Sequence, residues 1–188
     1  LYEKNPSLMD PYIEGSISTN PKRQDFLVHY KNCTRTLGLV ADNEWGDEWK
    51  TIAQKLKALE ATILKKSCEL YIRDPSGFSV INHNDMWVPN FFFKFNEDGE
   101  VNDVLFIDYQ MPHFNSPGID LNFLFYGALN EETRIFKAKK LLRIYHEVLR
   151  DTLAALNYPK PIPTLHNIHV EVLKTGLNSL IASFCEVP

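Results

Sequence analysis

The chain has 188 residues, of which 44% are hydrophobic, 12% aromatic and 23% charged, and its formal net charge is −4. This composition is that of a folded globular protein and excludes an intrinsically disordered chain. The sequence has no long basic stripe, which argues against nucleic acid as the main partner, and no apolar run approaches the roughly 18 residues of a membrane span.

The first 76 residues are predicted to be mainly helical. Residues 1–20 are rich in Pro, Ser and Asn, which favours a loop-like lead-in. Apolar residues at spacings of three and four then predict one helix over 22–41 and a longer one over 47–71. The inner face of the longer helix is expected to hold Trp49, Ile52, Ala53, Leu56, Leu59, Ile63, Leu64 and Cys68. The segment RDPSG, residues 73–77, ends the helical pattern.

The middle of the chain predicts β-structure. A short apolar strand is expected at Phe78–Ile81. The runs FFFKF (91–95) and DVLFIDY (103–109) flank NEDGEVN, whose Asp-Gly pair is a turn signal, so the two runs predict a β-hairpin. Residues Phe91–Phe93 are expected to anchor the first strand of this hairpin in the core.

The last part of the chain predicts a second helical section. Ser116 suits an N-cap and Pro117 suits the first position of the helix that follows. Residues 131–156 have the amphipathic pattern of one long helix, which the segment YPKPIP ends. One or two further helices are expected from Thr164 to Phe184, with a break at Gly176. These elements together predict an α+β protein that is mostly helical around a small central β element.

A polar cluster, HNDMWVPN (83–90), stands directly ahead of the apolar hairpin. Asn90 precedes the first strand and Asp108 ends the second, at equal distance from Gly99 in the turn, which predicts that they face each other with Cβ atoms about 5 Å apart. The preceding loop brings Asp85 to the same end of the hairpin. An amide and a carboxylate oxygen there suit Mg²⁺ on a phosphoryl donor, and the remaining carboxylate can orient a hydroxyl and accept its proton.

These residues also carry a family resemblance. HNDMWVPN followed by FIDYQ resembles the catalytic segment of kinases with the protein-kinase-like fold, which have His-x-Asp-x-x-x-x-Asn, a hairpin and then a metal-binding Asp. The whole stretch VINHNDMWVPNFFFKFNEDGEVNDVLFIDYQ and the later SPGIDLNFLFYG are similar to the CHK kinase-like, or ecdysteroid kinase-like, family. That family is related to the choline and aminoglycoside phosphotransferases. The resemblance is strongest over residues 78–127.

The resemblance implies roles at the matching positions. Asp85 is expected to be the catalytic aspartate, and Asn90 and Asp108 are expected to be the magnesium ligands that hold ATP. Asp120 resembles a helix aspartate that braces the catalytic loop by hydrogen bonds. Asn84 departs from the family, which usually has Gly at this position, but Asn is among the residues that best tolerate the positive φ that such a Gly suggests.

Structural interpretations of the same residues stay open. His83 is expected to be a packed, hydrogen-bonded loop residue rather than a general base. Trp87 could stack on a substrate, although a core anchor is the simpler role. For Asp85, Asn90 and Asp108 together, the alternative to a catalytic site is a network of caps and turns.

The resemblance implies that residues 1–188 form the C-terminal lobe of a protein-kinase-like, aminoglycoside phosphotransferase-like fold, with a central catalytic-loop β-hairpin. Within it, residues 1–76 are helical, 77–111 hold the catalytic loop and hairpin, and 112–188 are helical. A kinase of this fold also needs an N-terminal nucleotide lobe, with a loop that covers the phosphates and a lysine that pairs with them. No β-rich segment of that kind precedes Asp85, so the chain is expected to be part of a longer polypeptide.

The implied function of the full-length protein is ATP-dependent, Mg²⁺-dependent phosphorylation of a hydroxyl on a small molecule. The acceptor is expected to be an ecdysteroid-like or other small alcohol, choline-like substrates stay open, and the isolated chain is expected to be inactive. The alternative is a catalytically inactive pseudokinase or a small-ligand-binding relative.

The cysteines bear on the cellular compartment. Cys33, Cys68 and Cys185 are widely spaced and odd in number, and they form neither a disulfide framework nor a zinc-binding pattern. A reducing compartment is the simpler interpretation, and we therefore expect a cytoplasmic protein.

Overall fold

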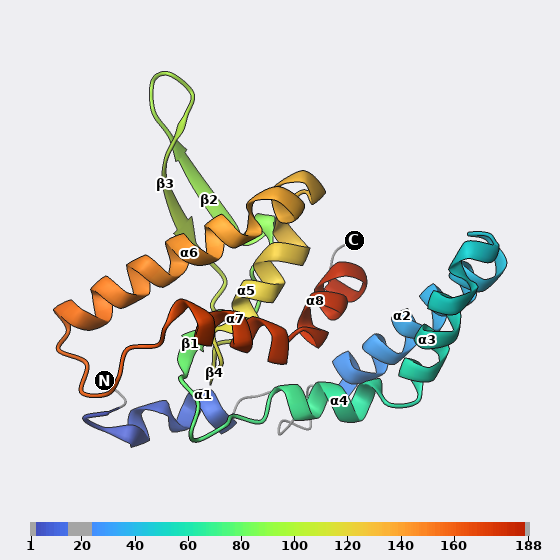
Figure 1. Ribbon diagram of the computed structural model, residues 1–188, viewed down its shortest axis with the longest axis horizontal. Coiled ribbons are helices and arrows are strands. Elements are labelled where there is room, and N and C mark those ends of the chain that lie inside the picture. The colour runs from blue at the N-terminus through green and yellow to red at the C-terminus, as the bar shows by residue number, and fades with distance from the viewer. Residues whose placement is uncertain (1–2, 15–23, 187–188) are drawn as a thin grey trace.

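A computed structural model describes residues 3–14 and 24–186, which fold into many helices and two small antiparallel sheets (Figure 1). The mostly helical α+β class predicted from the sequence is confirmed. The helices are η1 (Pro6–Met9), α1 (Asp10–Glu14), α2 (Gln24–Asn43), η3 (Asp47–Trp49), α3 (Lys50–Glu60), α4 (Ile63–Leu70), η4 (Val88–Asn90), α5 (Gly118–Phe123), η5 (Leu124–Ala128), α6 (Glu131–Ala155), α7 (Leu165–Lys174), α8 (Leu177–Ile181) and η6 (Ala182–Glu186). The strands are β1 (Val80–Asn82), β2 (Phe91–Phe95), β3 (Val101–Phe106) and β4 (His113–Asn115). None of the helices within the described ranges is both long and apolar enough to cross a membrane.

The predicted loop over residues 1–20 is wrong where the structure describes it, because η1 and α1 occupy residues 6–14. Pro6 starts η1, which suits its fixed φ and missing N–H. A distant contact also holds the segment, since the backbone carbonyl of Tyr12 lies 2.9 Å from Nδ1 of His113 in β4. Residues 3–5 are not in a helix or strand, whereas residues 1–2 and 15–20 of the predicted loop, and residues 22–23 of the predicted helix 22–41, lie outside the described residues.

The helix predicted over 47–71 is divided into η3, α3 and α4. The turn at Thr62 separates α3 from α4, so that Ile63 enters the core beside α2 and α8. The predicted inner face is correct at Ala53 and Leu56, which are buried, but Trp49 and Ile52 are 41% and 40% exposed. The cause is that α3 packs chiefly on α2, as a pair of helices that extends from the body (Figure 1).

Two apolar clusters join the remaining helices. The first brings together residues of α2, α4, α5 and α8, namely Leu27, Tyr30, Ile63, Tyr71, Ile119 and Ile181. The second joins α5 and η5 to α6 and α7 through Leu121, Phe125, Leu142 and Ile168. The predicted helix 131–156 is confirmed as α6, and the predicted break at Gly176 separates α7 from α8.

The β1–β4 sheet was only half predicted. The register pairs Val80 with Asn115 and Asn82 with His113, and all three residues of β4 are buried. The Asn82 side-chain amide donates to the backbone carbonyls of His113 and Asn115, at 3.2 Å each. Strand β4 has three residues, two of them polar, so its sequence shows no alternating pattern. Its pairing depends instead on the side-chain amide of the distant residue Asn82.

The hairpin forms as predicted, but its aromatic residues are not in the core. β2 pairs with β3 from Phe91 opposite Phe106 to Phe95 opposite Val101, with an irregularity after Lys94. Phe91 packs near Met86, whereas Phe92 and Leu105 are 60% and 62% exposed. The prediction that Phe91–Phe93 anchor the strand in the core is therefore wrong beyond Phe91, because the hairpin projects away from the helices (Figure 1).

The start of α5 is held against α7 at a site that has room only for glycine. Ser116 accepts a hydrogen bond at Oγ from the N–H of Gly118 (3.1 Å), but α5 begins at Gly118 with Pro117 as its N-cap, so the predicted cap at Ser116 and first helical position at Pro117 are wrong by one residue. A Cβ on Gly118 would lie 2.4 Å from the backbone oxygen of Glu171 and 2.3 Å from Oγ1 of Thr175. The Gly118 position therefore sets how closely α5 approaches α7.

We expect Gly118→Ala to lower the free energy of unfolding by about 1–3 kcal/mol, because the added methyl must displace the backbone of α7. Gly38→Ala is the matched control, since its added Cβ would make only ordinary contacts at 3.4 Å or more. That variant should be more stable by about 0.5–1 kcal/mol, because alanine is the better helix former. Urea denaturation of both variants measures the difference, and equal stability of Gly118→Ala and the wild type would contradict the close approach.

Candidate active site

The loop that follows β1 is fixed by one carboxylate. Asp120, on the first turn of α5, accepts hydrogen bonds at 2.7 Å from the backbone N–H of His83 at Oδ2 and of Asn84 at Oδ1. Its own backbone N–H donates to Oδ1 of Asn82 at 3.3 Å. The helix aspartate expected to brace this loop therefore does so, and it links the end of β1 to the start of α5.

Burial of Asp120 has an electrostatic cost. The loss of hydration raises the pKa of this carboxyl from its ordinary value of 3.8 to about 6, although the N–H groups of Asn84 and His83 act in the opposite direction. Burial of this carboxyl group is therefore unfavourable by itself, but the group supplies the hydrogen-bond acceptor for two backbone N–H groups.

Asn84 has the backbone geometry expected from its place in the motif. Its φ is 65°, in the left-handed region that Asn tolerates better than most residues. The side chain is buried, and Oδ1 lies 3.3 Å from the hydroxyl of Tyr71, which donates to it. The replacement of the usual Gly by Asn therefore leaves the loop conformation intact.

Asp85 and Asn90 are in direct contact. Nδ2 of Asn90 donates both to the Asp85 backbone carbonyl at 2.9 Å and to its carboxylate Oδ2 at 2.8 Å. A backbone carbonyl can only accept, so the amide nitrogen must face Asp85 and the amide oxygen Oδ1 remains for another ligand. Partial burial raises the pKa of Asp85 above its ordinary value, and the nearby charge of Asp108 acts in the same direction, while Asn90 and His83 lower it.

Asp108 does not face Asn90 across the ladder, and this prediction was wrong by one residue. The register places Asn90 opposite Ile107, whose N–H donates to the Asn90 carbonyl at 3.0 Å, and β3 ends at Phe106 rather than at 109. Asp108 follows with a φ of 63°, and its exposed carboxylate accepts a hydrogen bond from Gln110 at 3.2 Å. It still lies near enough to Asp85 to affect the pKa of that group.

His83 joins the loop to the end of the hairpin. Its Nε2 lies 2.8 Å from the carbonyl oxygen of Ile107, so Nε2 carries the proton and donates. The ring packs on Tyr109 with centroids 4.5 Å apart, while Nδ1 is buried without a hydrogen-bond partner. The expectation of a packed, hydrogen-bonded loop residue is confirmed, and its effect is to hold the backbone just before Asp108.

The oxygens of Asn90 and Asp108 are of the type that Mg²⁺ prefers. Oδ1 of Asn90 and the exposed carboxylate of Asp108 are hard donors, and Mg²⁺ commonly takes only one or two protein ligands together with water and phosphate oxygens. Within residues 3–14 and 24–186, no group of three or more His, Cys, Asp or Glu side chains could hold a metal by itself. The donor set therefore fits a metal that arrives with a phosphate ligand.

A cavity of about 240 Å³ opens beside Asp85. Its other lining residues come from distant parts of the chain, namely Tyr30, Tyr71, Asn84, Trp87, Gln110, Met111, Phe123, Asn178 and Ile181. Trp87 packs near the Met86 cluster and also lines the cavity, and its indole N–H is buried without a hydrogen-bond partner. Sequence reasoning did not find most of this wall, because no local pattern links residues of α2, α4 and α8.

Residues 1–158 match the sequence pattern of the ecdysteroid kinase-like family. The match covers more than half of the chain and includes Asp85, Asn90, Asp108 and Asp120. Neither a curated protein nor a solved structure matches this chain.

The raised pKa of Asp120 predicts a pH-dependent stability. In the folded state this carboxyl keeps its proton up to about pH 6, whereas in the unfolded state it keeps it only up to about pH 3.8. The stabilisation that its protonation gives the folded state is therefore complete below pH 3.8 and is lost as the pH rises through 6. Between acid and neutral pH, the unfolding free energy of the wild type should therefore fall by about 3 kcal/mol relative to that of Asp120→Asn. Urea denaturation at a series of pH values measures this difference.

A direct titration separates this effect from those of other carboxyl groups. The carboxyl carbon of Asp120 should titrate by ¹³C NMR with a midpoint near 6. A midpoint for Asp120 below 3.8 would show that the two backbone N–H groups outweigh burial.

Proposed function

The chain belongs to the ecdysteroid kinase-like family, and we propose that it is the C-terminal lobe of an ATP-dependent kinase that phosphorylates a hydroxyl group of a small molecule. One observation carries the proposal: the 2.8 Å contact between Asp85 and Asn90, on a loop that Asp120 holds beside a cavity. Phosphoryl transfer depends mainly on positioning and charge neutralisation. A fixed polar loop beside a cavity supplies the positioning, and a metal ion held by Asn90 and Asp108 would supply the neutralisation.

Asp85 acts in this proposal as the group that orients the acceptor. Its carboxylate accepts a hydrogen bond from the acceptor hydroxyl and takes the proton as the oxygen attacks the γ-phosphorus of ATP. The new oxygen–phosphorus bond forms while the bond from the γ-phosphorus to the bridging oxygen breaks, and ADP leaves. The raised pKa of Asp85 supports this role, because a carboxylate of higher pKa is the stronger base.

Asn90 and Asp108 would hold the magnesium ion that accompanies ATP. When bound, the ion neutralises charge on the phosphate oxygens. Asn90 is suited to the task because its nitrogen is fixed by Asp85 and its oxygen is therefore directed away from it. Asp108 would contribute a carboxylate oxygen. Its positive φ turns the backbone away from the direction of strand β3 at this position.

The cavity wall suits an acceptor that has both apolar surface and polar groups. Tyr30, Trp87, Phe123 and Ile181 supply aromatic and aliphatic surface, Asn84, Gln110 and Asn178 supply polar groups, and among the described lining residues Asp85 alone is charged. An ecdysteroid-like or other small lipophilic alcohol fits this chemistry, while a choline-like acceptor would use the aromatic faces instead.

A catalytically inactive relative is the second candidate. The observation in its favour is that the Asp108 carboxylate is bonded to Gln110 and does not face Asn90. A binding protein would keep the apolar cavity without the need for a metal site. Turnover of ATP by the full-length protein against a panel of steroids and amino alcohols distinguishes the two candidates, since an inactive relative consumes no ATP with any of them.

The proposal extends to domain organisation and location. Kinases of this fold bind the nucleotide between two lobes, and the described residues before Asp85 form helices and the short strand β1 rather than a β-rich nucleotide lobe. The proposed location is cytoplasmic, which rests on the cysteine pattern.

In the full-length protein, Asp85→Asn should lower kcat by about 100- to 10,000-fold, because the acceptor hydroxyl loses the group that takes its proton. The affinity for ATP should stay nearly unchanged, because the phosphates rest on other residues. Steady-state kinetics with a coupled ADP assay give both values. Asp98→Asn, at the tip of the hairpin, is the control and should leave kcat unaffected; near-normal turnover by Asp85→Asn would remove Asp85 from the mechanism.

Residues 1–188 alone should fold but should not turn over ATP, because half of the proposed nucleotide cleft is missing and positioning supplies most of the catalysis. Circular dichroism reports the fold, and the ADP assay reports turnover in the same preparation. Substrate-dependent ADP release by the folded 188-residue chain would contradict the one-lobe proposal without affecting the assignment of Asp85.

A further inference from the structure

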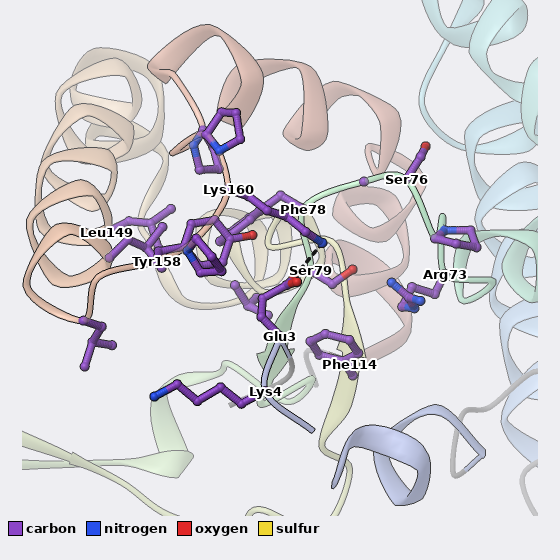
Figure 2. A pocket seen from close by; sticks show the side chains of 18 of the residues that line it. Glu3, Lys4, Arg73, Ser76, Phe78, Ser79, Phe114, Leu149, Tyr158 and Lys160 are labelled. Carbon is purple, nitrogen blue, oxygen red and sulfur yellow. Dashed lines mark ion pairs between the residues drawn. The ribbon is translucent and has the colours of Figure 1, made fainter. Parts of the chain in front are cut away.

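Two cavities among the described residues differ in their polar lining. A larger cavity, of about 680 Å³, lies at the other end of β1 from Asp85 and shares no lining residue with the small one (Figure 2). Glu3 and Lys160 in its lining form an ion pair at 2.7 Å, drawn as a dashed line in Figure 2. The Arg73 guanidinium lies over the Phe114 ring, 5.4 Å from its centroid. These charged side chains thus have partners within the protein.

In the small cavity, the Asn84 side chain has one paired end and one open end. It lines the cavity and is only 3% exposed. Its Oδ1 accepts the hydrogen bond from the Tyr71 hydroxyl, whereas its Nδ2 has no hydrogen-bond partner within the described ranges. The side-chain polar atoms that are fully enclosed there without a partner belong to Ser67, His83 and Trp87. Nδ2 of Asn84 is not enclosed in this way, and its N–H groups therefore open on the cavity.

Asn178, on α8, has the opposite end open. It lines the same cavity and is 1% exposed. Its Nδ2 donates to the backbone carbonyl of Ile119 at 2.9 Å, which fixes the orientation of the amide. Its Oδ1 accepts no hydrogen bond from the part of the chain that the structure describes, and it is not fully enclosed either. The small cavity therefore holds an open donor from Asn84 and an open acceptor from Asn178.

These two open groups restrict the chemistry of a ligand. A buried polar atom without a partner is unfavourable, so a ligand that pairs both groups binds better than one that pairs neither. A hydroxyl group carries an acceptor oxygen and a donor hydrogen, whereas an ether or ketone oxygen only accepts and an ammonium group only donates. Of these groups, a hydroxyl alone can meet both Asn84 and Asn178.

We propose that Asn84 and Asn178 form a subsite for a second hydroxyl group of the acceptor, apart from the hydroxyl that Asp85 meets. The inference rests on the proposed function, which places the acceptor in the small cavity. The amide N–H of Asn84 donates to the oxygen of the second hydroxyl, and the hydroxyl in turn donates to Oδ1 of Asn178. Glycine, which the family usually has at position 84, supplies no such donor. The subsite therefore makes Asn84 a specificity-determining residue of this chain.

Cyclohexanol and the three positional isomers of cyclohexanediol are the probes for titrations of the ¹⁵N-labelled chain, followed by NMR in the absence of ATP. The amide signals of Asn84 and Asp85 should shift and saturate, while that of Gly77, in the lining of the larger cavity, should stay in place. At least one diol should bind about tenfold more tightly than cyclohexanol, which is the gain expected from pairing a buried polar group.

Asn84→Gly removes the open donor and should abolish this preference. The diol should bind about tenfold more weakly than to the wild type, while the affinity for cyclohexanol should stay nearly unchanged. Glycine accepts the φ of 65° at this position, so the loop keeps its conformation. Asn157→Gly is the matched control, because Asn157 also has a positive φ, of 51°, but lines the larger cavity. That variant should keep the wild-type preference.

The proposal is overturned if no diol gives saturable shifts at Asp85, if cyclohexanol binds as tightly as every diol, or if folded Asn84→Gly keeps the wild-type preference. Shifts at Gly77 as large as those at Asp85 would also overturn it, because they indicate general adsorption. Failure of the proposed function is distinct, since the titration does not depend on turnover. A full-length protein that phosphorylates cyclohexanol and the diols with equal kcat/KM would remove the subsite and leave the kinase.

Discussion

The described structure around the candidate site depends on the pair of hydrogen bonds that the Asp120 carboxylate accepts from His83 and Asn84. Two consecutive backbone N–H groups can turn inward at this point because one carboxyl group accepts a hydrogen bond from each of them. The loop they fix carries Asp85, and the helix that carries Asp120 is held against α7 by the close approach at Gly118. The position of Asp85 therefore follows from how tightly α5 packs.

Local strain gathers at the same site. Asn84 and Asp108 both have positive φ, which is unfavourable for residues with a side chain, and each stands next to a residue that a tertiary hydrogen bond holds. Asp120 fixes the backbone at Asn84, and His83 fixes Ile107, directly before Asp108. Packing thus sustains one unfavourable conformation directly before Asp85 and another at Asp108, whose charge affects the pKa of Asp85.

The exposed hairpin and the two cavities give the described residues three surfaces with different chemistry. The hairpin presents aromatic and aliphatic side chains such as Phe92, Phe95 and Leu105 to solvent, and apolar surface of this kind marks an interaction site more often than a free face. Under the proposed function this face belongs next to a nucleotide lobe. The small cavity adjoins Asp85, and the large one lies at the opposite end of β1.

The sequence alone determined the helical body, the strand β2 and the long helix α6, because each has a local signal: a period of three to four residues or an Asp-Gly turn. It also brought Asp85 and Asn90 together, since five residues of loop leave them little room to separate. Only the tertiary structure decided the rest. The pairing of β4 depends on an amide 31 residues away in sequence, at Asn82. The one-residue offset of Asp108 arises from the register of the hairpin, which pairs Phe91 with Phe106 and is irregular after Lys94. The exposure of the hairpin likewise reflects what lies beside it in space, which an apolar pattern cannot specify.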